Sequence, residues 1–142
     1  MELSATTVIN RPVNEVFAYV IDLSNDVHWR KSVDESEMRS GQALEVGGLG
    51  YSRVRGQEID WRIVSYEPNK SVTWEMLNGP FLGHGGYRAA PVERGTQFTL
   101  YADIEPVGVF RLLGPVFGWM GQRGNQADVE KLKQILEAED QN

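Results

Sequence analysis

LLGPVFGWMGQRGNQADVEKLKQILEA (residues 112–138) has helical character throughout, but its two halves differ in composition. In the second half, Val129, Leu132 and Leu136 recur at helical spacing, with Ile135 beside them and charged residues on the other faces. This half should therefore pack its apolar stripe against a sheet and the other helices of the fold.

The first half contains four glycines, and each glycine inside a helix costs roughly 1 kcal/mol relative to alanine. They are Gly114, Gly118, Gly121 and Gly124. Eleven residues make about three helical turns, so Gly118 lies in line with Val129 and Gly121 with Leu132 if the helix is continuous. We expect such a helix to turn a face without side chains towards a concave sheet and to leave a hollow there.

A second interpretation breaks the helix at Gly114-Pro115 and again at residues 121–124. The large apolar residues a quarter-turn from the glycines would then point inwards as core. They are Phe110, Leu113, Phe117 and Met120. Both interpretations place a flexible apolar segment beside the sheet, compatible with a gate, and the sequence does not choose between them.

The chain before this helix predicts one strand, two short helices and about six antiparallel strands. Residues 2–10 are rich in β-branched residues, and Pro12 suits the first turn of a helix. A second short helix follows, which we expect Trp29 to anchor. Alternating apolar residues and turn motifs then recur from residue 33 to 105. Strands segregated from helices indicate an α+β fold, with a curved sheet wrapped around a last helix that runs from about Val109 to the C-terminus.

Length and composition bound the class of protein. The 142 residues favour a single domain, and the net charge of −6 argues against nucleic acid as a partner. The same charge argues weakly against docking on an anionic membrane. No apolar run approaches the ~18 residues of a spanning helix, and no signal peptide is evident, so we expect a cytoplasmic protein without integral membrane association.

Four segments together resemble a known superfamily. They are INRPVNEVFAYVIDLSNDVHW (9–29), IVSYEPNKSVTW (63–74), GTQFTLYADIEPVG (95–108) and the helix end KLKQILE (131–137). The chain resembles the START/SRPBCC helix-grip superfamily, which includes START lipid-transfer domains, birch-pollen-allergen-like proteins and polyketide cyclase/dehydrase-type proteins. The resemblance implies one helix-grip domain over residues 1–142, with two short helices after the first of about seven strands. It also implies an apolar cavity between the sheet and the C-terminal helix.

Strand alternation and the last helix supply candidate ligand-binding residues for such a cavity. They are Trp61, Trp74, Met76, Phe98, Leu100, Phe110, Leu113, Phe117 and Met120. Aromatic and methionine side chains suit apolar ligands. Each of them also fits plain core packing, and this alternative stays open.

The polar candidates lie in GHGGYR (residues 83–88). His84 and Arg88 share one strand face and Tyr87 lies on the other, and these residue types can serve as acid, base or electrophile. An exposed strand curved by its glycines explains the same pattern without chemistry. The sequence contains no cysteine and no histidine cluster of metal-binding spacing, so we expect no metal and no cofactor.

Three functions remain open. The first is non-enzymatic binding or transport of a hydrophobic small molecule such as a lipid, polyketide or isoprenoid. The second is a cyclase or dehydratase that uses His84, Tyr87 or Arg88, which a cavity with converging polar groups would favour. The third is a protein-interaction module resembling the Hsp90-ATPase-activator-like branch, which predicts a filled interior and an exposed apolar patch. The sequence leaves the oligomeric state open.

Overall fold

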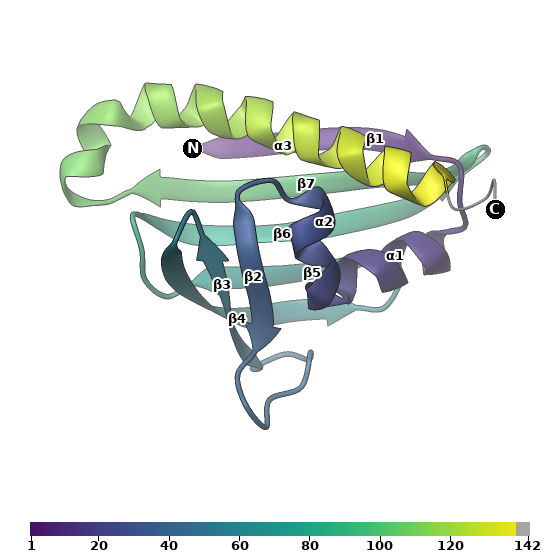
Figure 1. The fold of residues 1–142 in the computed structure, drawn as a ribbon, viewed down its shortest axis with the longest axis horizontal. Coiled ribbons are helices and arrows are strands. Elements are labelled where there is room, and N and C mark those ends of the chain that lie inside the picture. The colour runs from purple at the N-terminus through teal and green to yellow at the C-terminus, as the bar shows by residue number, and fades with distance from the viewer. Residues whose placement is uncertain (139–142) are drawn as a thin grey trace.

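A computed structural model describes residues 1–138, which form an α+β fold of one curved antiparallel sheet and helices on its concave face (Figure 1). The strands are β1 (Glu2–Ile9), β2 (Val33–Met38), β3 (Leu49–Val54), β4 (Gln57–Glu67), β5 (Ser71–Met76), β6 (Phe81–Val92) and β7 (Gly95–Pro106). The helices are α1 (Val13–Ile21), α2 (Asp26–Trp29) and α3 (Gly114–Ala138), with 3-10 turns η1 (Leu23–Asn25) and η2 (Gly108–Leu113). This confirms the predicted helix-grip class; residues 139–142, where the last helix was also expected, lie outside the described part.

The seven strands of the described chain follow the order β1-β7-β6-β5-β4-β3-β2, and every pair is antiparallel. From β2 to β7 each strand pairs with its successor in sequence, while β1 closes the opposite edge against β7. The strands alternate buried and exposed residues because one face meets the helices and the other meets solvent. α3 runs along β1 and β7, α1 contacts β6 and β7, and α2 contacts the edge strand β2 and α3 (Figure 1).

The core forms where the second half of α3 meets α2 and the sheet. Val129 and Leu132 are fully buried and Leu136 nearly so, as the apolar stripe predicted. Trp29 at the end of α2 is buried as well, with its ring 5.6 Å from that of Tyr87 and 5.9 Å from that of Phe98. Trp29 thus holds α2 on the sheet, the role expected for it.

α3 is continuous from Gly114, so the interpretation with a broken helix is wrong for residues 114–138. The glycines do not mainly leave a hollow, however. A β-carbon on Gly118 would lie 2.8 Å from the Met1 sulfur, and one on Gly121 would lie 2.9 Å from a Leu3 methyl carbon. Gly118 and Gly121 therefore permit close packing on Met1 and β1, and Gly121 also borders the cavity under the helices, whereas Gly114 lines a separate groove beside Met1 and Arg111.

Candidate functional site

A cavity of about 270 Å³ lies between the concave face of the sheet, the two short helices and α3. Its wall is mainly apolar, contributed by alternate residues of β4, β5 and β7. Among the residues that line it are Trp61, Ile63, Val72, Trp74, Met76 and Leu100. The volume is near the lower end of the ~300–1,000 Å³ typical of small-molecule sites.

Four of the predicted ligand-binding residues line this cavity: Trp61, Trp74, Met76 and Leu100. Phe98 shares the inner face of β7 but does not line the cavity. It lies in the core beneath α2, fully buried, with its ring against Trp29. A ligand-binding role for the four lining residues stays a prediction.

The other four predicted residues lie outside the cavity. Phe110 and Leu113 belong to η2 and are exposed, and Met120 on α3 is exposed too. Phe117 is partly buried, and its ring lies 5.3 Å from that of Phe81 and 5.9 Å from that of Phe110. For Phe117 and Met120 the physical reason is the rotation of α3, because Gly118 and Gly121 face Met1 and Leu3 and turn the large side chains away from the cavity, whereas Phe110 and Leu113 precede α3 in η2.

A polar group also borders the cavity, and the sequence did not reveal it. Asp26 and Arg30 lie four residues apart across α2, and Tyr87 reaches the same place from β6. The Arg30 Nη1 donates a hydrogen bond to the Tyr87 hydroxyl at 3.3 Å, and its Nε lies 3.5 Å from Oδ2 of Asp128 on α3. Three elements distant in sequence thus meet around one guanidinium.

Burial sets the electrostatics of this group. It raises the pKa of Asp26 to about 6, although the nearby Arg30 partly opposes the rise. Burial also raises the pKa of the Tyr87 hydroxyl and of the Asp128 carboxyl. Burial alone would lower the pKa of Arg30, but Tyr87, Asp26 and Asp128 outweigh this effect. The pKa of Arg30 is therefore raised and the guanidinium stays charged. Asp26 is therefore the group that titrates near neutral pH.

Some buried polar atoms in and beside this group lack a hydrogen-bond partner. Within residues 1–138, the buried side-chain polar atoms without a hydrogen-bond partner are Oδ1 of Asp26, Nε of Arg30 and Nε1 of Trp29. Buried polar atoms in native proteins are nearly always hydrogen-bonded. Asp26 and Arg30 also line the cavity. A polar group of a bound molecule would find a free acceptor in Oδ1 of Asp26, whereas Nε of Arg30 already faces the Asp128 carboxylate.

Of the three polar candidates in GHGGYR, only Tyr87 faces the cavity. His84 points to the outer face of the sheet, where its Nε2 lies 3.9 Å from a Glu75 carboxylate oxygen. Arg88 stacks over the ring of Tyr101 at 4.3 Å. The expected strand parity is correct, and it separates the three residues instead of bringing them together.

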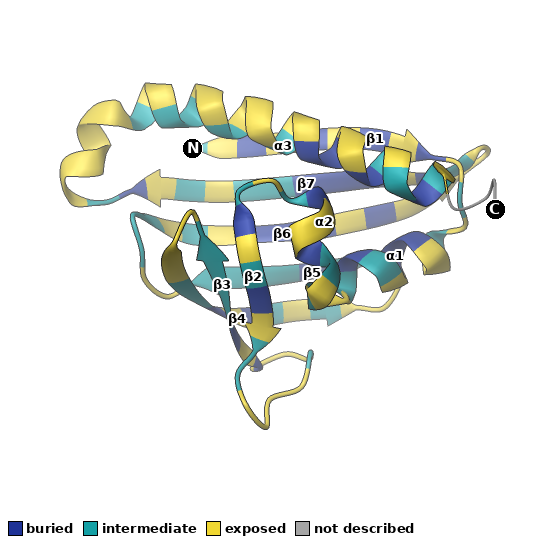
Figure 2. Cartoon of the chain, in the orientation of Figure 1, coloured by how far each residue is buried: buried dark blue, intermediate teal, exposed yellow. Residues whose placement is uncertain are grey.

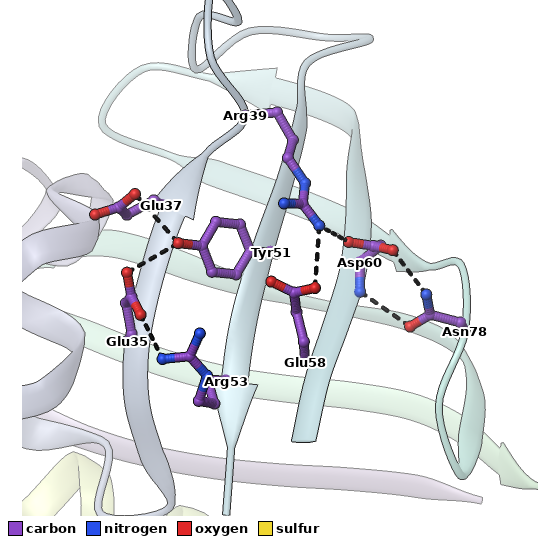
Figure 3. Close-up of polar contacts among 8 residues, drawn as sticks. All are labelled: Glu35, Glu37, Arg39, Tyr51, Arg53, Glu58, Asp60 and Asn78. Carbon is purple, nitrogen blue, oxygen red and sulfur yellow. Dashed lines mark hydrogen bonds and ion pairs between the residues drawn. The ribbon is translucent and has the colours of Figure 1, made fainter. Parts of the chain in front are cut away.

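The outer face of β2, β3 and β4 carries a dense polar cluster (Figure 3). Its members are Glu35, Glu37, Arg39, Tyr51, Arg53, Glu58, Asp60 and Asn78. The Tyr51 hydroxyl donates to Glu35 at 2.8 Å, and this bond is the main reason that the pKa of Tyr51 rises to about 12. Glu35 also accepts from Arg53 at 2.7 Å, and the Arg39 guanidinium lowers the pKa of Asp60. Cross-strand pairs of this kind stabilise a sheet, and this explains why charged residues gather on its outer face.

No group of three potential metal ligands occurs among the described residues. In residues 1–138, no helix combines the length and the apolar character needed to cross a membrane. The cavity and its polar group are therefore the candidate site: an apolar chamber with one hydrogen-bonding corner.

The comparisons with known proteins agree on one family and fold. A family model described as polyketide cyclase / dehydrase and lipid transport matches residues 1–137. None of the curated proteins has a matching sequence.

Solved structures of similar fold share little sequence with the chain. A START superfamily protein from Mycobacterium smegmatis has a TM-score of 0.79 at 13% identity, over 96% of this chain and 97% of that one. The Zhui aromatase/cyclase from Streptomyces sp. R1128 has a TM-score of 0.79 at 14% identity, over 96% and 93%. The protein TTHA0849 from Thermus thermophilus has a TM-score of 0.77 at 19% identity, over 97% and 98%. At these identities the likeness shows the fold alone.

Proposed function

Because the chain belongs to the polyketide cyclase/dehydrase and lipid transport family, we propose that it binds a compact hydrophobic molecule with one polar end in the cavity. The observation that carries this proposal is an apolar chamber bordered by Asp26, Arg30 and Tyr87. Family membership supports a hydrophobic ligand, and the geometry of the chamber supports the finer description of that ligand.

The apolar wall supplies most of the affinity. Transfer of apolar surface from water contributes about 25 cal/mol per Å², from which the costs of association are subtracted. The aromatic rings of Trp61 and Trp74 offer flat contact surfaces, and Met76 adapts its shape. A volume of about 270 Å³ suits a small ring system or a short isoprenoid better than a two-chain lipid.

The polar corner orients the ligand. Arg30 donates hydrogen bonds, and Asp26 accepts them when ionised or donates one when protonated. Two carboxylates already surround the guanidinium, so a neutral hydroxyl or carbonyl oxygen suits the corner better than a further anion. The proposed ligand therefore ends in a neutral oxygen function.

The test is native mass spectrometry of the protein purified from its own host, followed by identification of the extracted small molecule. Ala102 lines the cavity on β7, and Ala102→Trp fills the space; His84→Ala on the outer face is the control. We expect a stoichiometric ligand on the wild type and on the control, and none on Ala102→Trp, with circular dichroism confirming that all three fold. A clean apo mass, together with no thermal stabilisation by small aromatic polyketides or isoprenoid alcohols, would count against the proposal.

A second candidate is acid–base catalysis on the bound molecule, of the cyclase or dehydratase kind. The observation that favours it is the pKa of Asp26, about 6, because a group poised near working pH can both take and give a proton. Incubation with the identified ligand distinguishes the two functions. Loss of one water from the ligand, abolished in Asp26→Asn, supports catalysis; an unchanged ligand supports binding alone.

The third function expected from the sequence, a protein-interaction module, stays a prediction that the cavity speaks against, since it requires a filled interior. The exposed apolar patch that it also predicted does exist, on η2 and α3.

A further inference from the structure

The segment from η2 into α3 exposes an unusual amount of apolar surface. Half of the large exposed hydrophobic side chains of the described chain, seven of fourteen, fall between residues 109 and 120. They are Val109, Phe110, Leu112, Leu113, Val116, Trp119 and Met120. Leu112 is 86% exposed and Trp119 is 61% exposed, so these side chains do not belong to the core (Figure 2).

These residues form a stripe, not a scatter. Within α3, Trp119 and Met120 follow Val116 by three and four residues, the spacing that keeps side chains on one side of a helix, and η2 adds the four others directly before them. We call the seven residues the outer stripe. The opposite side of α3, with Gly118 and Gly121, packs on β1. The first half of α3 is thus apolar on two sides, and only one of them is covered by the described chain.

The charge around the outer stripe differs in sign from that of the whole protein. From residue 106 to 127 the charged residues are Arg111 and Arg123, with no aspartate or glutamate, although the chain carries a net −6. Glu105, just before this stretch, is exposed and borders the same groove as Arg111, so the local balance is one positive charge. The Arg123 guanidinium lies 4.9 Å from the centre of the Trp119 ring, at the end of the stripe. Apolar side chains flanked by tryptophan and arginine are the pattern of a helix that lies in the surface of a bilayer. Each arginine near an anionic surface adds about 1 kcal/mol.

We propose that the outer stripe docks this protein on the surface of an anionic lipid bilayer, with α3 parallel to the membrane plane. Complementarity of charge selects this occupant, because the exposed apolar residues of an otherwise acidic protein are accompanied here by Arg111 and Arg123. The position of the outer stripe also supports docking on lipid, because Gly121, one residue beyond the stripe, borders the cavity. A hydrophobic ligand would then leave or enter next to the lipid. Docking itself does not depend on the proposed ligand.

Trp119 supplies a built-in probe. The other tryptophans, Trp29, Trp61 and Trp74, are buried or partly buried, so a change in exposure on docking reports mainly on Trp119. The experiment adds vesicles of equal parts phosphatidylglycerol and phosphatidylcholine, or of phosphatidylcholine alone, to the full chain. We expect a blue shift, protection from acrylamide and co-flotation with the anionic vesicles, all weakened by added salt.

Two variants test the stripe itself. Leu112→Gln combined with Val116→Gln should reduce partitioning by about tenfold or more, because each buried side chain of this size contributes on the order of one such factor. Val46→Gln, at an equally exposed valine outside the stripe, should bind as the wild type does. Both positions are exposed, so the variants should keep the wild-type melting temperature.

Two results would overturn the proposal. One is an absence of binding to either vesicle. The other is a dimer, seen by light scattering, that the double variant abolishes while neither protein binds vesicles, which would make the outer stripe a contact between two copies. Neither result bears on the ligand proposal, since mass spectrometry tests that without lipid.

Discussion

Asp26→Asn should make the protein more stable at neutral pH, although it removes a buried charge beside Arg30. Burial raises the pKa of Asp26 from 3.8 to about 6, so the folded protein binds a proton there more readily than the unfolded chain does. A carboxyl with a raised pKa lowers stability as pH rises from its unfolded pKa to its folded pKa. Ionised Asp26 therefore weakens the fold above about pH 6, and asparagine resembles the protonated form.

The size of the effect follows from the shift. Roughly two pKa units at 1.36 kcal/mol each give about 3 kcal/mol, a net figure that already includes the attraction of the carboxylate to Arg30 and is an upper value because asparagine only partly reproduces the protonated carboxyl. The difference in unfolding free energy between variant and wild type should be near zero at pH 4, grow between pH 4 and 6, and stay constant above pH 7. Because only the difference is used, titration of Asp128 and of the surface carboxylates cancels.

Urea unfolding followed by tryptophan fluorescence, repeated from pH 4 to pH 8, measures this difference. Asp34→Asn is the control, since Asp34 is exposed and its contact with the Gly56 amide can be kept by asparagine. Its unfolding free energy should stay within about 0.5 kcal/mol of wild type at every pH. If Asp26→Asn is instead less stable at pH 8, with a pH profile parallel to that of wild type, then ionised Asp26 does not destabilise the fold and its pKa is not raised.

Three further perturbations probe the site and the helix. Arg30→Met leaves Asp128 and Asp26 without their cation. The unfolding free energy should therefore fall by about 3–5 kcal/mol at pH 7 and by less at pH 5, measured by urea unfolding. An equal loss at both pH values would contradict the pairing. Tyr87→Phe removes the hydroxyl beside Arg30 and should weaken binding of an oxygen-bearing ligand by up to about tenfold, measured by titration, with His84→Ala unchanged. Gly124→Ala, where a β-carbon meets open space, should stabilise α3 by about 1 kcal/mol in thermal unfolding, whereas Gly121→Ala should gain less because a Leu3 methyl must move. Equal gains at the two glycines would show that α3 does not press on β1.

A binding role would explain why the fold keeps a buried carboxyl, Asp26, that lowers its stability at neutral pH. An apolar residue at position 26 would avoid burying a carboxylate that lowers the stability of the fold at neutral pH. Unpaired polar atoms on Asp26 and Arg30 beside a cavity agree with a role in holding a ligand group, because functional sites are where such local costs are retained. Loss of ligand in Asp26→Asn together with a gain in stability would join the two observations.

The sequence by itself determined the order of helices and strands, the α+β class and the inner faces of the strands. These follow from periods of 2 and 3.6 residues, which are local properties of the chain. The period-2 pattern placed Trp61, Trp74, Met76 and Leu100 correctly on the cavity wall, and the same parity separated Tyr87 from its neighbours in GHGGYR.

Only the tertiary structure decided the rest. The spacing of the glycines in α3 does not say what they face, and it is Met1 and Leu3, more than 100 residues earlier in the chain, that approach Gly118 and Gly121. The polar corner needs Asp26 of α2, Arg30 at its end, Tyr87 of β6 and Asp128 of α3, and no local pattern relates the first two to Tyr87 or Asp128. Burial then raised the pKa of Asp26, because desolvation depends on what surrounds a side chain in space and not on what precedes it in sequence.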